Sequence, residues 1–311
     1  MKKCLVLGAG GFIGRNLCAQ LLKEGWYVRA FEKFNCEQLR ELKVHDIVET
    51  DYLATEDFRD VLDGIDVVYH LISTTLPKAG SDHIISEEIE KNLIPTIRLL
   101  ESMKKVGTKK IVFASSGGSI YGDYSGKPNM VGNPLRPKCT YALQKQWIED
   151  SLQFYKTIYG INICIARISN PYGVGQSVNR VQGVIPIFID RLLKNMPIVL
   201  LGADSRRDYI YMDDVTDALV RLGEYEGAET VFNIASGESY SLSEIVSKIE
   251  IIADRNFESV SKQEQRDFDV DHSIIDVSVT QKELGWKAKI SLEHGIEKLY
   301  HRLTNTITKS E

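Results

Sequence analysis

The residues of this sequence best suited to chemistry are a tyrosine and a lysine four positions apart, Tyr141 and Lys145. If the segment is helical, both side chains project from one face and their tips can meet in one site. A free phenol, with a pKa of about 10, is a poor base at neutral pH, but a nearby ammonium and an oxidised nicotinamide both favour the phenolate. Tyr141 could then take a proton from a hydroxyl while hydride leaves the same carbon. The alternative is an exposed amphipathic helix face.

A glycine-rich segment near the N-terminus could bind the cofactor for this chemistry. Gly8, Gly11 and Gly14 follow an apolar strand and open a helix, which is the context of a dinucleotide-binding turn. The glycines permit a tight turn, close approach of the backbone to pyrophosphate, and packing of the helix on the strand. The helix N-terminus then offers unpaired N–H groups and partial positive charge to the phosphates. The alternative is a purely structural turn.

An acidic residue, Glu32, ends the second predicted strand, 18 residues after Gly14. This is near the spacing at which a carboxylate accepts hydrogen bonds from the adenosine ribose. A carboxylate there repels the 2′-phosphate of NADP, so the sequence favours NAD, although Lys33 and Arg15 lie close in sequence. Asp51, at the end of the third predicted strand, could reach the adenine amino group. Glu32 could instead be a solvated surface residue.

The elements that position these residues alternate between short apolar, β-branched runs and segments of helical period, which predicts parallel strands with crossover helices. The predicted strands cover residues 4–7, 27–31, 47–49, 67–70, 111–114 and 161–168. The predicted helices cover residues 13–24, 55–62, 86–105 and 141–159. This pattern indicates an α/β fold with a doubly wound parallel sheet of the Rossmann type.

The regular alternation ends at Asn170, after which glycines and prolines break the chain into short pieces. We therefore expect a dinucleotide-binding domain over 1–169 and a smaller, mixed α/β substrate-binding lobe over 170–211 and 237–311. A predicted strand over 230–235 could rejoin the main sheet, so 212–236 is assigned to the first domain.

The composition, with 43% hydrophobic and 26% charged residues in 311, is that of a soluble globular protein. No apolar run approaches the roughly 18 residues of a membrane span, and a net charge of −5 provides no basic surface for nucleic acid. Neither a membrane nor a nucleic acid is therefore expected as a partner.

The five cysteines form no C-x-x-C pair and accompany no histidine cluster, so we expect a reduced, cytoplasmic protein without a metal. Lys2 and Lys3 before an apolar stretch superficially imitate a signal peptide, but the glycine spacing favours a loop.

Several motifs together resemble those of the extended short-chain dehydrogenase/reductases, in particular nucleotide-sugar epimerases and dehydratases. They are Gly8-Ala9-Gly10-Gly11-Phe12-Ile13-Gly14, Ser115-Ser116-Gly117-Gly118-Ser119-Ile120-Tyr121-Gly122, Tyr141-Ala142-Leu143-Gln144-Lys145, Asn170-Pro171-Tyr172-Gly173 and Arg207-Asp208-Tyr209-Ile210-Tyr211. The resemblance covers nearly the whole chain. It is specific for the family and much less so for the sugar or the reaction.

The resemblance implies that Tyr141 is the acid/base and that Lys145 holds the nicotinamide ribose and depresses the tyrosine pKa. It places Asn92 near the active site and Asn170, Arg207 and Arg266 at the nucleotide diphosphate, where a planar guanidinium suits phosphate oxygens. The arginines could instead pair with nearby aspartates on the surface. Further cofactor contacts are expected at Phe12, Ile13, Tyr52, Leu71 and Ser115. A homodimer through the helices over 86–105 and 141–159 is also implied.

The chain departs from the family pattern at Gly117, where relatives usually carry the Ser or Thr that hydrogen-bonds the reacting hydroxyl. Ser116 and Ser119 are the available substitutes, because either could donate to a developing keto oxygen. Both could equally belong to a polar strand-to-loop junction. Related 4,6-dehydratases carry Asp-Glu after the threonine, and decarboxylating relatives carry a glutamate at the position of Ser119. The residues Gly118 and Ser119 therefore disfavour both reactions.

The leading prediction is a cytoplasmic, NAD-dependent UDP-hexose 4-epimerase of polysaccharide biosynthesis, which acts on a nucleotide-diphosphate sugar by transient oxidation at C4. The alternative is an NAD(P)H-dependent nucleotide-4-keto-sugar reductase, which Gly117 favours. A third candidate from another class is a non-catalytic dinucleotide-binding regulator, against which the intact Tyr141 and Lys145 argue. His70, at a strand end, is predicted to be a core residue rather than a catalyst.

Overall fold

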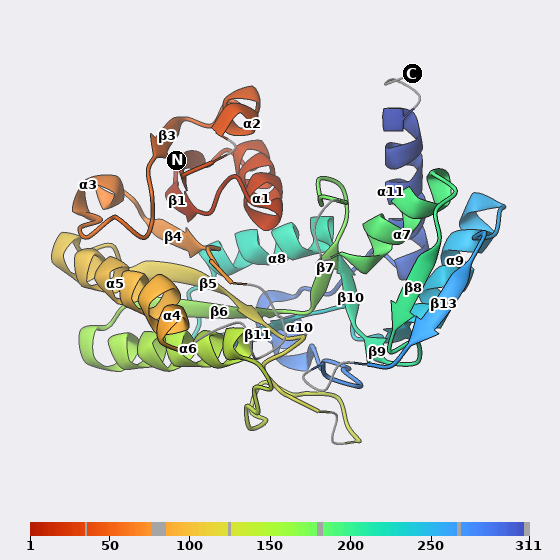
Figure 1. Cartoon of the computed structure of the whole chain (residues 1–311). Coiled ribbons are helices and arrows are strands. Elements are labelled where there is room, and N and C mark those ends of the chain that lie inside the picture. Colours follow the sequence, from red (N-terminus) through yellow and green to blue (C-terminus); the bar gives the residue numbers. More distant parts are fainter. Residues whose placement is uncertain (35, 76–84, 124–125, 179–182, 266–268, 308–311) are drawn as a thin grey trace.

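The computed structural model of the chain describes residues 1–34, 36–75, 85–123, 126–178, 183–265 and 269–307. Within these residues, the centre of the molecule is a seven-stranded parallel sheet in the order β11-β6-β5-β4-β1-β2-β3 (Figure 1). Its strands are β1 (Lys3–Leu7), β2 (Tyr27–Glu32), β3 (Asp46–Glu49), β4 (Val67–His70), β5 (Lys110–Ser116), β6 (Asn162–Ile168) and β11 (Val231–Ile234). The predicted doubly wound α/β sheet is confirmed, and the strand expected near residues 230–235 lies at its edge beside β6.

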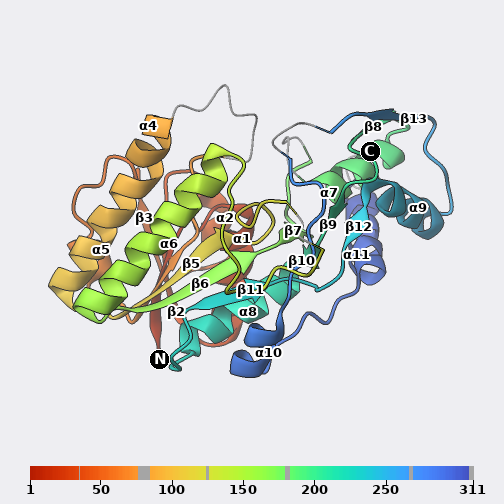
Figure 2. The same cartoon turned by 90° about the horizontal axis from the view of Figure 1, so that it is seen from below.

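Helices cover both faces of the sheet, which is why its strands read as continuous apolar runs. On one face pack α1 (Phe12–Lys23) and α8 (Met212–Glu224), and on the other α5 (Ile94–Val106) and α6 (Thr140–Tyr159) (Figures 1 and 2). Successive side chains of a strand point to opposite faces, so Cys4 and Val6 of β1 enter the first core and Leu5 and Leu7 the second. The remaining helices near the sheet are α2 (Cys36–Glu41), α3 (Arg59–Leu62) and α10 (Ser278–Leu284).

A smaller lobe with its own apolar core lies beside the sheet, on the right in Figure 2. Its helices are α7 (Val184–Leu193), α9 (Leu242–Ala253) and α11 (Leu292–Ile307). Its strands pair in twos: β7 (Asn170–Tyr172) with β10 (Tyr209–Tyr211), β9 (Arg206–Arg207) with β12 (Tyr240–Ser241), and β8 (Ile198–Leu201) with β13 (Val260–Gln263). The lobe therefore faces the glycine turn across the ends of the main strands.

Two predicted helices differ from the structure. The helix expected over 55–62 begins only at Arg59, because Asp51 organises a turn before it by accepting hydrogen bonds from the N–H groups of Leu53 and Thr55. The helix expected over 86–105 consists of α4 (Ile85–Glu88), a π-helical turn η1 (Ile89–Leu93) and α5. Pro95 has no N–H for the regular helical bond to the turn before it, which accounts for a break at this place. Such π turns often mark functional sites.

Two further features of the structure concern the apolar character of its helices and the state of its cysteines. No helix in the described ranges combines the length and the apolar character that crossing a bilayer requires. All five cysteines are free thiols.

Candidate active site

The glycine turn between β1 and α1 requires glycine at Gly8, because of its backbone conformation, and at Gly14, because of a close contact. Gly8 has φ +81°, in the left-handed region that favours glycine. A Cβ on Gly14 would lie 2.1 Å from the Gly8 carbonyl oxygen, so α1 can approach the turn this closely only with glycine there. Gly11 begins the helix without a side-chain cap, which leaves the first N–H groups of α1 for a ligand. This cradle fits the pyrophosphate of a dinucleotide.

The acidic residues expected at the cofactor lie beside this turn. A carboxylate oxygen of Glu32 accepts a hydrogen bond from the Gly10 N–H at 2.8 Å, so this side chain stands directly against the loop. The Lys33 ammonium binds Asp51 at 2.6 Å, and this bond lowers the pKa of the Asp51 carboxyl. The lysine that could have attracted a 2′-phosphate is therefore neutralised, and the arrangement suits NAD.

Tyr141 and Lys145 lie in the first turns of α6, with the Lys145 Nζ 5.8 Å from the centroid of the tyrosine ring. The ammonium donates a hydrogen bond to the Ala114 carbonyl of β5 at 2.9 Å. Ser116, at the end of β5, lies close enough to Tyr141 to lower the pKa of its phenol, and its hydroxyl lies 2.7 Å from that of Ser119. The structure thus brings together the four side chains predicted from the sequence to take part in the reaction, which are Tyr141, Lys145, Ser116 and Ser119.

Burial opposes the charged forms of the central pair. It raises the pKa of Tyr141 to about 12, an effect that Ser116 partly offsets. Burial also lowers the pKa of Lys145 to about 8, while the carboxylates of Glu149 and Glu88 act in the opposite direction. Lys145 is therefore charged at neutral pH, but the protein alone leaves Tyr141 a neutral phenol. A positive charge such as that of an oxidised nicotinamide would lower the pKa of this phenol.

Gly117 cannot be replaced by the usual family Ser or Thr without a shift of the backbone. A Cβ on this residue would lie 2.8 Å from the Arg167 carbonyl oxygen and 2.9 Å from Cδ1 of Ile275. The loop after β5 therefore has no space for a side chain at this position. Its neighbours Ser116 and Ser119 carry hydroxyls, which are 2.7 Å apart, and both line the cavity together with Tyr141.

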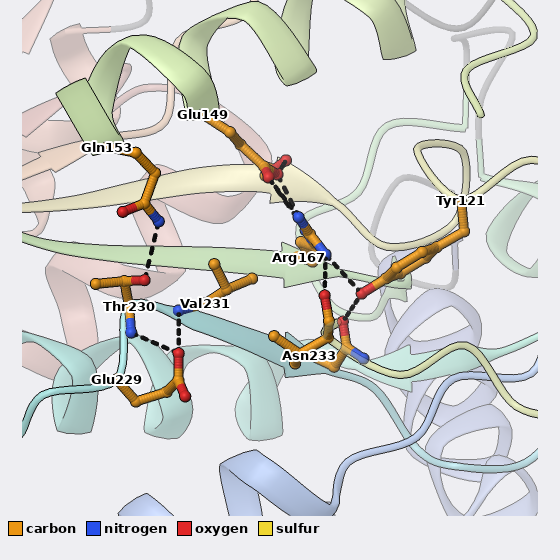
Figure 3. A network of polar contacts seen from close by, with 10 residues as sticks. Tyr121, Glu149, Gln153, Arg167, Glu229, Thr230, Val231 and Asn233 are labelled. Atoms are coloured by element: carbon orange, nitrogen blue, oxygen red, sulfur yellow. Dashed lines mark hydrogen bonds and ion pairs between the residues drawn. The ribbon is translucent and has the colours of Figure 1, made fainter. Parts of the chain in front are cut away.

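A buried polar network holds α6 against the sheet (Figure 3). Glu149 of α6 forms an ion pair with Arg167 of β6 at 2.7 Å, and their side chains are 4% and 6% exposed. Arg167 also donates to the Tyr121 hydroxyl at 3.0 Å, which donates to Asn233 of β11 at 2.6 Å. Ser115, expected at the cofactor, donates its hydroxyl to Glu149 instead. The network therefore fixes the helix that carries the tyrosine and the lysine.

A cavity of about 730 Å³ runs from the glycine turn to the smaller lobe. The predicted site residues in its lining are Gly8, Gly11, Phe12, Ile13, Gly14, Leu71, Ser116, Ser119, Tyr141, Asn170 and Arg207. Sequence reasoning missed Thr75, Lys138, Cys139 and Asp269, which also line it. No motif marks these four, although Lys138 and Cys139 directly precede the tyrosine segment. No group of three or more His, Cys, Asp or Glu side chains in the described part of the chain could hold a metal ion.

Some predicted site residues do not reach this cavity. Tyr52 is buried in the core, where its hydroxyl lies 3.1 Å from both His70 Nε2 and the Thr96 hydroxyl. Burial lowers the pKa of His70 to about 3, so this histidine is a neutral core residue, as expected. Asn92 is also buried, and its side-chain oxygen accepts hydrogen bonds from the N–H and hydroxyl of Thr74. Glu32, Asp51, Ser115 and Lys145 are not among the lining residues, and Arg266 lies outside the described residues.

The two described residues expected at the diphosphate lie on paired strands. Asn170 of β7 donates from its amide to the Asp208 carbonyl at 2.7 Å. Arg207 donates to the Asp271 carbonyl at 3.0 Å and keeps its guanidinium at the cavity. The alternative pairing with Asp208 does not form, since that carboxylate accepts the N–H groups of Ser236 and Gly237 at 2.9 and 2.8 Å. Arg207 is therefore placed to bind an anion.

Known proteins share both the sequence and the fold of this chain. The NAD dependent epimerase/dehydratase family model matches residues 4–235. The chain is 33% identical to the dTDP-4-dehydro-6-deoxyglucose reductase of Escherichia coli, with 95% of each chain covered. It is 29% identical to the UDP-glucose 4-epimerase of Mycolicibacterium smegmatis, over 95% of this chain and 96% of that one. The solved structure of the Thermus thermophilus UDP-glucose 4-epimerase in complex with NAD matches with a TM-score of 0.85 and 27% identity, covering 97% of this chain and 99% of that one.

Proposed function

The chain belongs to the NAD-dependent epimerase/dehydratase family, and we propose that it is a UDP-hexose 4-epimerase that oxidises C4 of its sugar transiently. The observation that carries this proposal is the cluster of Tyr141, Ser116 and Lys145 beside a cavity that starts at the glycine turn. When bound, NAD supplies the acceptor of the C4 hydride and returns the hydride to the sugar.

In this reaction Tyr141 moves the proton at O4 of the sugar. Its phenolate takes the proton of the C4 hydroxyl as that carbon is oxidised, and its phenol returns the proton after the keto-sugar has turned over. The Ser116 hydroxyl, supported by Ser119, donates a hydrogen bond to the developing keto oxygen. The Lys145 ammonium, held by the Ala114 carbonyl, favours the phenolate.

The smaller lobe anchors the part of the substrate that does not react. We assign Asn170 and Arg207 to the diphosphate, because a guanidinium binds phosphate oxygens with two parallel hydrogen bonds. A diphosphate held at this end lets the keto-sugar rotate and present its other face without leaving the cavity. Tight binding at one end and loose contact at the other is what inversion at a single carbon requires.

A second candidate is an NAD(P)H-dependent nucleotide-4-keto-sugar reductase. The glycine at position 117 and the 33% identity to the Escherichia coli reductase favour it. The same residues would serve, with Tyr141 as a proton donor only, and the reduced cofactor would be consumed. No observation favours a regulator without catalysis.

One assay separates the two reactions. The purified protein is mixed with UDP-glucose or UDP-N-acetylglucosamine, and the sugar is followed by NMR. A 4-epimerase inverts C4 with no net change in NADH, whereas a reductase leaves these sugars unchanged and consumes NAD(P)H when a nucleotide-4-keto-6-deoxy sugar is added. A panel of nucleotide sugars left unaltered by both tests would contradict both assignments.

We further propose that the protein works in the cytoplasm as a homodimer joined through α5 and α6. Phe154 and Ile158 of α6 are each 56% exposed, and Val106 of α5 is 40% exposed. Apolar side chains gathered on neighbouring helices are typical of interaction surfaces. Sedimentation should give a dimer for the wild-type protein and a monomer for Phe154→Glu, and a monomeric wild type would contradict the proposal.

A further inference from the structure

One buried acidic residue near Tyr141 and Lys145, Glu88, has no role in the proposed reaction. Glu88, at the end of α4, is fully buried. Its carboxylate accepts hydrogen bonds from the Thr75 hydroxyl at 2.8 Å, the Asn92 amide at 2.9 Å and the Thr140 hydroxyl at 3.3 Å. All three donors are neutral, and no cation in the described part of the chain forms an ion pair with it. A buried carboxylate in this state is costly unless a positive charge lies nearby.

Lys145 is a buried cation whose hydrogen-bond partner is uncharged. The residue is 2% exposed, and its ammonium bonds to a neutral carbonyl, that of Ala114. Glu149, one turn further along α6, is already paired with Arg167. The other titratable groups facing the ammonium are Tyr141 and His70, and burial keeps both of them neutral. Glu88 is the other carboxylate that acts on Lys145, and Lys91, a second cation on which Glu88 acts, forms its ion pair with Glu87 instead.

The fold places both of these groups at the first turns of α6. The bond from Thr140 to Glu88 holds the carboxylate at the helix N-terminus, where the backbone N–H groups favour a negative charge. Lys145 lies one turn after Tyr141 on the same helix. The negative charge of Glu88 raises the pKa of Lys145 and also that of Tyr141, so its field reaches both groups.

We propose that Glu88 is a positioning residue of the active site, whose carboxylate is the buried counter-charge of the Lys145 ammonium and holds Thr75 at the cavity wall. This inference rests on the proposed function, in which Lys145 must remain charged. The carboxylate keeps the ammonium protonated and makes the phenol harder to ionise. Without Glu88, both groups would lose their protons at lower pH.

The pH dependence of kcat/KM tests this role with an isosteric change. Glu88→Gln removes the charge and keeps the shape, so both limbs of the bell-shaped profile should move to lower pH by about half a unit to one unit. The matched control is Glu87→Gln, which removes the neighbouring, partly exposed carboxylate that binds Lys91, and its limbs should stay in place. If Glu88→Gln lowers stability or rate but leaves both limbs unmoved, the proposal is overturned.

A double-mutant cycle in thermal unfolding tests the charge pairing without any substrate. Glu88→Gln and Lys145→Met each leave one buried charge alone, and the double variant removes both. The double variant should therefore unfold at a higher temperature than the sum of the two single shifts predicts. If Glu88→Gln alone fails to fold, the charge pairing can still be tested, because the double variant should then recover a folded state.

The two experiments distinguish this inference from the proposed function. A non-additive cycle together with an inactive wild-type protein would reject the epimerase and retain the pairing of Glu88 with Lys145. Additive shifts, or a double variant no more stable than the weaker single variant, would reject the pairing even if C4 inversion is observed.

Discussion

The Lys145 ammonium lies 5.8 Å from the centroid of the Tyr141 ring, on the next turn of α6. At this distance the cation favours the phenolate through a dry site rather than through a direct hydrogen bond. Burial nevertheless raises the pKa of Tyr141 to about 12, so the lysine alone does not make a base at neutral pH. In the proposed reaction the tyrosine would become reactive only when the oxidised cofactor is bound, which would tie proton removal to the presence of a hydride acceptor.

Replacing the phenol tests its part in the reaction. Tyr141→Phe keeps the ring and removes only the oxygen that carries the proton. We expect the rate of C4 inversion to fall by about 10²- to 10⁴-fold. NAD binding, measured by calorimetry, should be retained because the glycine turn is unchanged. An unchanged rate would remove Tyr141 from the reaction.

The glycine turn predicts a specific loss of cofactor binding. A Cβ at position 14 would meet the Gly8 carbonyl oxygen and the Ala9 backbone, at 2.1 and 2.8 Å, so Gly14→Ala must displace the turn. We expect a loss of about 1–3 kcal/mol in the free energy of unfolding and at least about a tenfold loss of NAD affinity. The control is Gly132→Ala, which enters open space. Equal NAD affinity in both variants would contradict this placement of the cofactor.

The assignment of Arg207 to the diphosphate predicts a defect in binding rather than in chemistry. Arg207→Met removes charge-assisted hydrogen bonds worth about 1.5–3 kcal/mol, so KM for UDP-glucose should rise about 10- to 100-fold with kcat close to wild type. Arg206→Met is the matched control, because Arg206 pairs with Glu244 at 2.9 Å. A fall in kcat with unchanged KM would contradict the assignment.

The buried lysine predicts how activity and stability respond to alkaline pH. Burial lowers the pKa of Lys145 from 10.5 to about 8, so activity should fall above about pH 8 as the ammonium is lost. Between these two values the unfolded chain binds more protons, and the lysine's contribution to folding stability therefore increases with pH. Thermal unfolding of the wild type, measured relative to Lys145→Met from pH 8 upward, should show this rise. A constant difference would show that folding does not shift the pKa of Lys145, and a falling difference would show that folding raises it, so either result would contradict the prediction.

The ion pair in Figure 3 predicts a loss of stability that surface pairs do not share. Arg167→Met leaves Glu149 buried and unpaired, which should cost about 3–5 kcal/mol in the free energy of unfolding. Arg221→Met breaks a pair with Asp217 whose side chains are 39% and 33% exposed, and should cost at most about 1 kcal/mol. Denaturant titration of both variants provides the comparison, and equal losses would contradict a structural role for the network.

The sheet and the glycine turn could be predicted because local patterns determine them. Cys4 to Leu7 are apolar at every position, as a strand buried on both faces must be, and Gly8, Gly11 and Gly14 follow directly. The pair of Tyr141 and Lys145 could also be predicted, since a helix alone brings residues four apart together. In each case the relevant contacts lie within a few positions of one another.

The rest of the site depends on contacts between distant segments. Two of the donors to Glu88, Thr75 and Thr140, lie 13 and 52 residues from it in sequence, and no spacing rule predicts these contacts. The π-helical turn before α5 leaves Asn92 bound to Thr74 and Glu88 instead of facing the cavity. Tyr52 follows Asp51 in sequence but belongs to the core, because the chain turns at that point.

The central claim is that Tyr141 moves the proton at O4 while the hydrogen on C4 leaves as hydride and returns to the opposite face. The most direct measurement follows UDP-glucose deuterated at C4 by NMR. We expect the C4 epimer to form with deuterium still on C4 and no accumulation of reduced cofactor. Inversion with deuterium lost to solvent, or no inversion with deuterium trapped in NADH, would contradict the claim.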